Sequence, residues 1–356
     1  MHFIRPLFAV SPRELGIFCE EVSVMYGAGV ELVTCLEILG PDGKNKFFSE
    51  DIQNVKKRVQ QGASLSEATA ASPDSFPPLF ISMIQAGELG GSLDQIFKNL
   101  GDYYHSQAAL KSKLFHTLLY PVIVLIIAVL VVLFLLTSVI PIFVNIFNAM
   151  DAKIPLVTQI LMDVSAGVTK GLPFFIILIV LLFCFFKRLP AESTFRYQCD
   201  RLLLKLPAVG KMIYYVESLR FADALGILLS NGIELMTALK VVENTIGNRY
   251  IRTEFSHVRL AVRQGSPFAE SLKVTGIIEA DFYQMVRVGE QSGALDRSLK
   301  TIAAFYKEES DRRLKTMMTI IEPAILVIVG LFVMFIVLSI MTPIYEIYQG
   351  YANILN

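Results

Sequence analysis

The chain has 356 residues, of which 54% are hydrophobic and 18% charged, and its 32 Lys and Arg side chains balance 32 Asp and Glu. A nucleic-acid-binding protein would usually show a basic excess, so this balance argues against that class. The apolar composition favours a membrane protein. The N-terminal stretch "MHFIRPLFAVSPREL" has only a short apolar piece, so we predict no cleaved signal peptide.

Residues 1–113 are predicted to form a cytoplasmic bundle of short amphipathic helices. In its last part, apolar residues recur at helical spacing, namely Leu93, Ile96, Phe97, Leu100 and Tyr104. No alternating β-branched run bounded by hairpin turns competes with this pattern. The fold class expected is therefore an all-α membrane protein.

Three apolar stretches are predicted to cross a membrane. The first lies within 114–145 and the third within 318–345, and each holds an uncharged run long enough for a transmembrane helix. The second, 166–187, is shorter, and a buried or re-entrant hairpin is its alternative. Lys and Arg gather on the N-terminal side of the first and third spans and after the second, so the N-terminus and both polar segments are expected in the cytoplasm. The loop 146–165 and the tail 346–356 are then periplasmic.

The second polar segment, residues 188–317, repeats the first. "MIQAGELGGSLDQIFKNLGDYY" from Met83 matches "MVRVGEQSGALDRSLKTIAAFY" from Met285, an offset of 289 − 87 = 202. Further upstream Gly29 matches Gly232, an offset of 203. The chain is thus predicted to be a duplication, in which two homologous cytoplasmic helical bundles each lead into a transmembrane helix.

Both copies keep a "GE..G.LD" passage, interpreted as a corner between two helices. Gly87 and Gly289 are expected to close the first helix in a left-handed conformation, and Gly91 and Gly293 to lie in a linker too tight for a side chain. The acidic residues are expected to favour the N-terminus of the next helix through its dipole, and a catalytic carboxylate pair is disfavoured. The remaining residues of the passage are Glu88, Leu93 and Asp94 in the first copy and Glu290, Leu295 and Asp296 in the second.

Four prolines and one acid mark the spans. Pro121 pairs with Pro323 and Pro141 with Pro343 at the same offset, and the first pair is interpreted as beginning helices or setting kinks. Glu322 precedes Pro323 at the threshold of the third span, where a structural or interfacial role is preferred to an ion relay.

The duplicated segment, its corner and the prolines together resemble the inner-membrane platform proteins of type II secretion systems and type IV pili, the GspF/PilC family with its type II secretion F domain. The passages that carry the resemblance are "AGELGGSLDQIF", "VGEQSGALDRSL", "EPAILVIVG" and "MTPIY". It implies a non-enzymatic, homo-oligomeric protein of the bacterial inner membrane. It further implies that a cytoplasmic assembly ATPase, a pilin or pseudopilin and other machine components are its partners. The repeat begins close to the N-terminus, which favours a pilus-type member over a secretion-type one.

Other functions find less support in the sequence. The chain has no Walker A motif, no H-E-x-x-H and no ligand spacing among its histidines or cysteines, so no cofactor, metal or catalytic residue is predicted. A small repeat-built transporter is the alternative from another class, although the spans lack polar midplane residues and the repeats share one orientation. A structural anchor without a motor partner is the third option.

Overall fold

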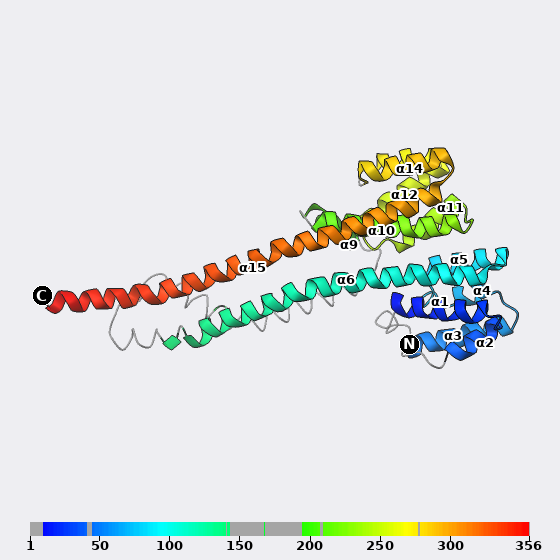
Figure 1. Cartoon of the computed structure of the whole chain (residues 1–356). Helices are drawn as coiled ribbons and strands as arrows, with labels where there is room; N and C mark the ends of the chain where they lie inside the picture. The colour runs from blue at the N-terminus through cyan, green and yellow to red at the C-terminus, as the bar shows by residue number, and fades with distance from the viewer. Residues whose placement is uncertain are drawn as a thin grey trace. The chain divides into compact units, whose positions relative to one another are not determined.

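The computed structural model describes residues 10–40, 45–139, 141–142, 167, 194–206, 209–276 and 278–355. Every regular element in these ranges is a helix (Figure 1). The chain divides into two compact units, the first made of Met1–Leu114 with Thr194–Arg313 and the second of Phe115–Ser193 with Leu314–Asn356. Both copies of the repeat therefore belong to the first unit.

Repeat 1 comprises five short helices and the start of a long one. Their starts follow from local sequence. Ser11 and Ser64 each form a capping box with a glutamate three residues further along, and the Asn45 side chain caps the helix that begins at Lys46. The helices are α1 (Pro12–Gly27), α2 (Leu32–Leu39), α3 (Lys46–Gln60), α4 (Leu65–Ala70), α5 (Pro78–Gly90) and α6 (Leu93–Phe134).

The core of repeat 1 contains a cluster of phenylalanines contributed by α1, α3, α5, α6 and the loop before α5. Phe18 lies 5.5 Å from Phe48, and Phe76 lies 5.0 Å from Phe80, measured between ring centroids. Phe97 on α6 joins them through Phe18 and Phe80. Aromatic pairs at these separations contribute stacking as well as buried area, so α6 is fixed to the bundle.

Repeat 2 has the same order of helices from α10 to α15, with an additional helix α9 before them and a 3-10 turn η3 after α11. Its core includes Phe221 stacked on Phe255 with ring centroids 4.0 Å apart, and Phe282 against Tyr306 at 5.5 Å. The elements are α9 (Thr194–Lys205), α10 (Val209–Ser230), α11 (Leu235–Val242), a 3-10 turn η3 (Glu243–Thr245), α12 (Arg249–Arg263), α13 (Phe268–Val274), α14 (Ala280–Ser292) and α15 (Leu295–Leu355). The sequence-based prediction of two homologous helical segments agrees with this architecture.

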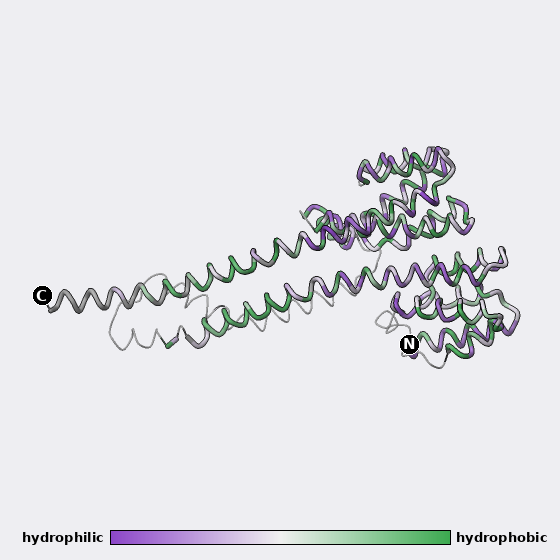
Figure 2. Tube along the Cα trace, in the orientation of Figure 1, coloured by the Kyte–Doolittle hydropathy of each residue, from purple (hydrophilic) through white to green (hydrophobic). Residues whose placement is uncertain are grey.

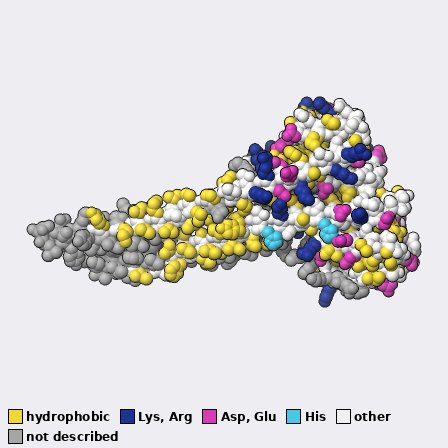
Figure 3. Space-filling view, viewed as in Figure 1, with side chains coloured by type: hydrophobic (Ala, Val, Ile, Leu, Met, Phe, Trp, Pro, Cys, Tyr) yellow, Lys and Arg dark blue, Asp and Glu magenta, His cyan; other side chains and the backbone are white. Residues whose placement is uncertain are grey.

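Two helices, α6 and α15, are long and apolar enough to cross a membrane. Their apolar segments appear as continuous hydrophobic stretches in Figure 2, and Figure 3 shows hydrophobic side chains along them, whereas charged side chains gather over the helices of the first unit. Both helices begin in the polar bundles and continue into the apolar segments without interruption. The first and third predicted spans thus correspond to helices of sufficient length, and the second, 166–187, lies outside the described residues apart from Gly167.

Pro121 and Pro323 do not begin helices, contrary to one of the interpretations from the sequence. Pro121 lies inside α6, and Pro323 and Pro343 lie inside α15. A short π-helical segment, Leu135–Val139, follows α6, and Pro141 is helical just beyond it. Thr137 donates to the carbonyl of Leu133 at 2.8 Å, as a hydroxyl inside an apolar helix is expected to do.

Candidate functional site: the repeated glycine–glutamate corners

The "GE..G.LD" passage forms the corner between α5 and α6 in repeat 1 and between α14 and α15 in repeat 2. In both copies the first helix ends at a left-handed glycine, Gly91 with φ 66° and Gly293 with φ 68°. The amide after each glycine donates to the carbonyl of Gly87 or Gly289, at 3.0 and 2.9 Å. Leu93 and Leu295 then begin the next helix.

The roles of the two glycines are the reverse of those expected from the sequence. Gly87 and Gly289 are buried helical residues within α5 and α14, not left-handed ones. A Cβ at Gly87 would lie 2.7 Å from Cγ1 of Ile96, and one at Gly289 would lie 2.6 Å from Cβ of Ser298. Gly91 and Gly293 have room for a side chain, but their φ values are costly for any residue with a Cβ. The first glycine of each pair therefore permits close packing, and the second permits the turn.

The glutamates of the passage cap a different helix from the one expected. The carboxylate of Glu88 accepts hydrogen bonds from the backbone N–H groups of Leu65 and Ser66, and from the Ser66 hydroxyl. These groups form the first turn of α4, not of α6. A carboxylate at this position satisfies amides that have no partner within the helix and lies at the favourable end of its dipole.

Repeat 2 builds the same contact. Glu290 accepts from the backbone N–H groups of Phe268 at 2.7 Å and Ala269 at 3.0 Å, the first turn of α13. The residue before this helix is Pro267, which provides no side-chain cap, so Glu290 supplies what the local sequence lacks. Each corner thereby joins the first turn of a short helix to the end of another helix, through a glutamate 23 residues after Leu65 in repeat 1 and 22 residues after Phe268 in repeat 2. Charge-assisted bonds of this kind are the stronger class.

The aspartates behave as predicted from the sequence. Asp94 and Asp296 lie in the first turns of α6 and α15, where a negative charge complements the helix dipole. The hydroxyl of Ser23 on α1 also donates to the Asp94 carbonyl at 3.1 Å, which joins this turn to α1. The corner therefore positions the helix that continues into the apolar segment.

The other predicted site residues do not join the corners. Pro121, Pro141, Pro323 and Pro343 belong to the apolar helices described above, and Glu322 lies on α15 one residue before Pro323. The role of Glu322 stays a prediction. Within the part of the chain that the structure describes, no group of three His, Cys, Asp or Glu side chains could hold a metal ion.

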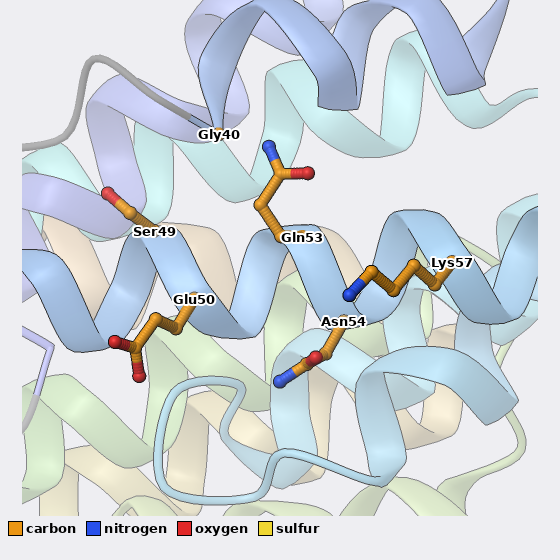
Figure 4. A pocket seen from close by; sticks show the side chains of 6 residues that line it. All are labelled: Gly40, Ser49, Glu50, Gln53, Asn54 and Lys57. Atoms are coloured by element: carbon orange, nitrogen blue, oxygen red, sulfur yellow. The ribbon is translucent and has the colours of Figure 1, made fainter.

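A polar hollow of about 420 Å³ lies between the end of α2 and α3 in repeat 1 (Figure 4). Gln53 rises from α3 toward Gly40, and a Cβ at Gly40 would collide with its amide nitrogen. The carboxylate of Glu50 and the amide of Asn54 point away from Gly40. Because its polar groups do not converge, the hollow has no arrangement that would orient a small molecule.

Two buried acids, Asp51 and Glu217, were not predicted from the sequence. Asp51 accepts hydrogen bonds from the hydroxyls of Ser72 and Ser75, which secures the loop after α4. Glu217 accepts from the Gly247 amide at 3.0 Å and forms an ion pair with Arg220 at 3.3 Å. Burial raises the pKa of Glu217. Their buried positions become apparent only when distant segments pack together.

Comparison with known proteins places these observations in a family. The model of the type II secretion system (T2SS) protein F family matches residues 18–141 and 221–343, so each copy of the repeat is matched once. The chain belongs to this family. Type IV pilus assembly protein PilC of Pseudomonas aeruginosa is 29% identical over 339 residues, covering 95% of this chain and 91% of that protein.

Family members from two kinds of machine are similar to the chain at nearly the same level. PilC of Thermus thermophilus is 31% identical over 336 residues, covering 94% of this chain and 82% of the relative. Type II secretion system protein F of Aeromonas hydrophila is 29% identical over 338 residues, covering 95% and 87% respectively. The predicted resemblance to the GspF/PilC family is thereby confirmed.

Proposed function

We propose that the chain is the inner-membrane platform protein of a type IV pilus machine, and that it couples a cytoplasmic assembly ATPase to the extraction and polymerisation of pilin. The observation that supports this most directly is the duplicated corner, which in each copy fixes a polar bundle to a helix able to span a membrane. A bundle held rigidly at the start of such a helix can pass a displacement from a soluble partner to the membrane. The platform itself performs no chemistry in this proposal, and its energy comes from the ATPase.

The proposed arrangement in the membrane has three spans, with the N-terminus and both bundles in the cytoplasm and the tail in the periplasm. The flanking Lys and Arg residues support this orientation. The proposed partners are the ATPase at the bundles, pilin at the spans, other inner-membrane components and further copies of this chain.

Affinity purification of the tagged full-length chain from gently solubilised membranes, followed by mass spectrometry, tests the proposal. Co-purification of an assembly ATPase with a pilin is expected. Recovery of secretion-type pseudopilins would instead support the second candidate, the equivalent platform of a type II secretion system or DNA-uptake pseudopilus, which the relatives named type II secretion system protein F favour. Solute or ion flux in liposomes, with neither partner recovered, would contradict both and support a transporter.

A second test uses the corner itself. Gly87→Val is expected to abolish assembly, because the added side chain collides with Ile96 and displaces α6 from the bundle. Exposed Leu89, two residues further along α5, provides the matched control as Leu89→Val. Normal assembly by the Gly87 variant at normal protein level would count against the proposed role of the corner.

A further inference from the structure

The two repeats contact one another within the first unit mainly through non-equivalent faces, with one ion pair between the equivalent helices, from Lys113 on α6 to Asp311 on α15. Repeat 1 contributes α5, which packs on α11, and the α6 face, defined by Asn99, Tyr103 and Gln107. Repeat 2 contributes the α10–α11 face, defined by Arg220, Asp223, Ile227, Asn231 and Val241. The side-chain amide of Asn99 donates to that of Asn231 at 3.0 Å, and Gln107 forms a hydrogen bond with Asp223. Tyr103 and Val241 line the same hollow of about 260 Å³.

Each of these faces has a counterpart in the other repeat. With the offsets of 202 and 203, the α6 face corresponds to the α15 face, defined by Thr301, Phe305 and Glu309. The α10–α11 face corresponds to the α1–α2 face, defined by Ile17, Glu20, Val24, Ala28 and Ile38. If a two-fold axis related the two repeats, the α15 face would contact the α1–α2 face in the same way. The structure leaves all of these residues exposed except Glu309, whose side chain is 11% exposed.

Their exposure shows the difference quantitatively. Tyr103 is 7% exposed, whereas its counterpart Phe305 is 45% exposed. Val241 is 8% exposed, whereas its counterpart Ile38 is 50% exposed, and Val24 on the neighbouring helix is 69% exposed. Large apolar side chains at equivalent positions are therefore covered in one repeat and open in the other, which marks the open set as an interaction surface.

We propose that the α1–α2 face of one chain binds the α15 face of a second copy, in the arrangement that the α10–α11 and α6 faces adopt within a single chain. Such a contact is head-to-tail, because it joins two different surfaces of identical chains. Both bundles are followed along the chain by a helix able to span a membrane. A second copy that repeats the internal relation therefore keeps the same orientation in the bilayer.

The charges at the open faces are compatible with this partner. Glu20 and Glu21 are exposed on α1, and Lys307 and Arg312 are exposed on α15. Glu309, which takes the place of Gln107, is bound by Arg312 and Arg313 at 2.7–2.9 Å, so its charge is compensated. Glu20 pairs with His105 on α6 at 3.0 Å and Arg312 pairs with Glu309, so a contact of Arg312 with Glu20 of the neighbouring copy would exchange existing pairs and be a rim contact of modest strength.

Site-specific cross-linking of the full-length protein in membranes tests the contact. The internal pair Asn99–Asn231 corresponds to Thr301–Ala28, and both of the latter are exposed. Chains carrying Ala28→Cys or Thr301→Cys are co-expressed with different tags and treated with a short bismaleimide. Cys184 and Cys199 are first replaced by Ser. Cys19 and Cys35 are buried, and burial raises the pKa of the Cys19 thiol, which disfavours the reactive thiolate.

The mixed adduct is expected to exceed either like-with-like adduct by about tenfold, because a head-to-tail contact brings different surfaces together. A chain carrying both Asn99→Cys and Asn231→Cys should cross-link internally and serves as the positive control. Equal like-with-like adducts, or none in a preparation where this control reacts, would overturn the proposal.

A matched pair of valines provides the second measurement. Val24→Asp should weaken self-association about tenfold in detergent, equivalent to about 1.4 kcal/mol. Val274→Asp, at a residue 85% exposed on α13 and outside both faces, should leave it unchanged. Equal effects would overturn the proposal. So would a Val24 variant that loses ATPase binding but keeps its self-association. The inference rests on the proposed function only for the membrane orientation. If the folded protein co-purifies with the ATPase but remains monomeric, the contact between copies is wrong and the platform role stands.

Discussion

Glu88 and Glu290 show how a single side chain can determine the packing of a short helix. Helices of six or seven residues are too short to be stable alone, and their first amides need partners. In α4 the preceding residue Ser64 accepts one of these amide hydrogen bonds in a capping box, whereas α13 is preceded by Pro267, which provides no side-chain cap. The glutamate contact should therefore matter more in repeat 2.

We expect Glu290→Gln to speed amide hydrogen exchange at Phe268 and Ala269 about tenfold, which corresponds to a loss of about 1.4 kcal/mol. Glu88→Gln should produce a smaller change at Leu65 and Ser66. Hydrogen-exchange mass spectrometry of the full-length protein in detergent measures both. Glu21→Gln, an exposed acid on α1, is the control, and an equal effect there would contradict the capping role.

The two glycines of each corner should differ in how well they accept asparagine, which tolerates left-handed backbone better than most residues. Gly91→Asn should cost less than about 1 kcal/mol, and Gly91→Ala about 1–2 kcal/mol. Gly87→Asn and Gly87→Ala should both destabilise by about 1–3 kcal/mol, because overpacking does not depend on backbone preference. Thermal unfolding of the four variants measures these differences. If Gly87→Asn were clearly more stable than Gly87→Ala, the assignment of Gly87 to close packing would be wrong.

The sequence predicted which residues of the corner matter but not what each one does. The pattern of glycine and glutamate repeated at a fixed offset was sufficient to locate the turn and its aspartates. It could not show that Gly87 packs on Ile96 or that Glu88 reaches the amide of Leu65, 23 residues away. Both contacts depend on the tertiary packing of helices that are separated along the chain.

At the level of the elements, helical periodicity predicted the buried face of α6 correctly, with Ile96, Phe97 and Leu100 fully or almost fully buried. On α15 the same spacing does not ensure burial, because Phe305, three residues after buried Ile302, is exposed while its neighbour Tyr306 is buried. Periodicity identifies apolar positions, and it does not distinguish a residue that packs inside its own bundle from one available to another surface.

The contact between α6 and α10 places an acid where its charge is costly. Burial raises the pKa of Asp223 to about 6, and the hydrogen bond with Gln107 and the charge of Lys307 offset this only in part. An unfolded aspartate titrates near 3.9. Between about pH 4 and pH 6 the folded protein therefore binds more protons at this site than the unfolded chain does, and the free energy of unfolding falls as pH rises through that range.

Asp223→Asn should remove this dependence. The variant is expected to gain on the order of 1–2 kcal/mol over the parent above pH 7 and to lose that advantage near pH 4. Thermal unfolding of the full-length protein in detergent between pH 4 and pH 8 measures the difference. Glu20→Gln, at the equivalent exposed position of repeat 1, should show no such gain, and an equal gain there would contradict the argument from burial.

On the scale of the whole molecule, the contact between the repeats constrains how the chain passes through the membrane. Asn99 and Asn231 can meet only if both bundles lie on the same side of the bilayer. In the proposed three-span topology α6 crosses the membrane, and the span predicted at 166–187, which lies outside the described residues, returns the chain to the side of repeat 1. A re-entrant hairpin at 166–187, the alternative that the sequence left open, would place repeat 2 on the opposite side.

Reporter fusions test this count of crossings. A phosphatase active only in the periplasm should be active when fused within 146–165 or after residue 356, and inactive when fused after Leu206 or at the N-terminus. A fluorescent protein that matures in the cytoplasm should give the complementary pattern at the same four points. With two crossings in place of three, the fusion after Leu206 would be active, and repeat 2 would lie across the bilayer from repeat 1. The contact of Asn99 with Asn231 would then be impossible within a chain, so an active fusion at that point would exclude both the three-span topology and the association of the repeats.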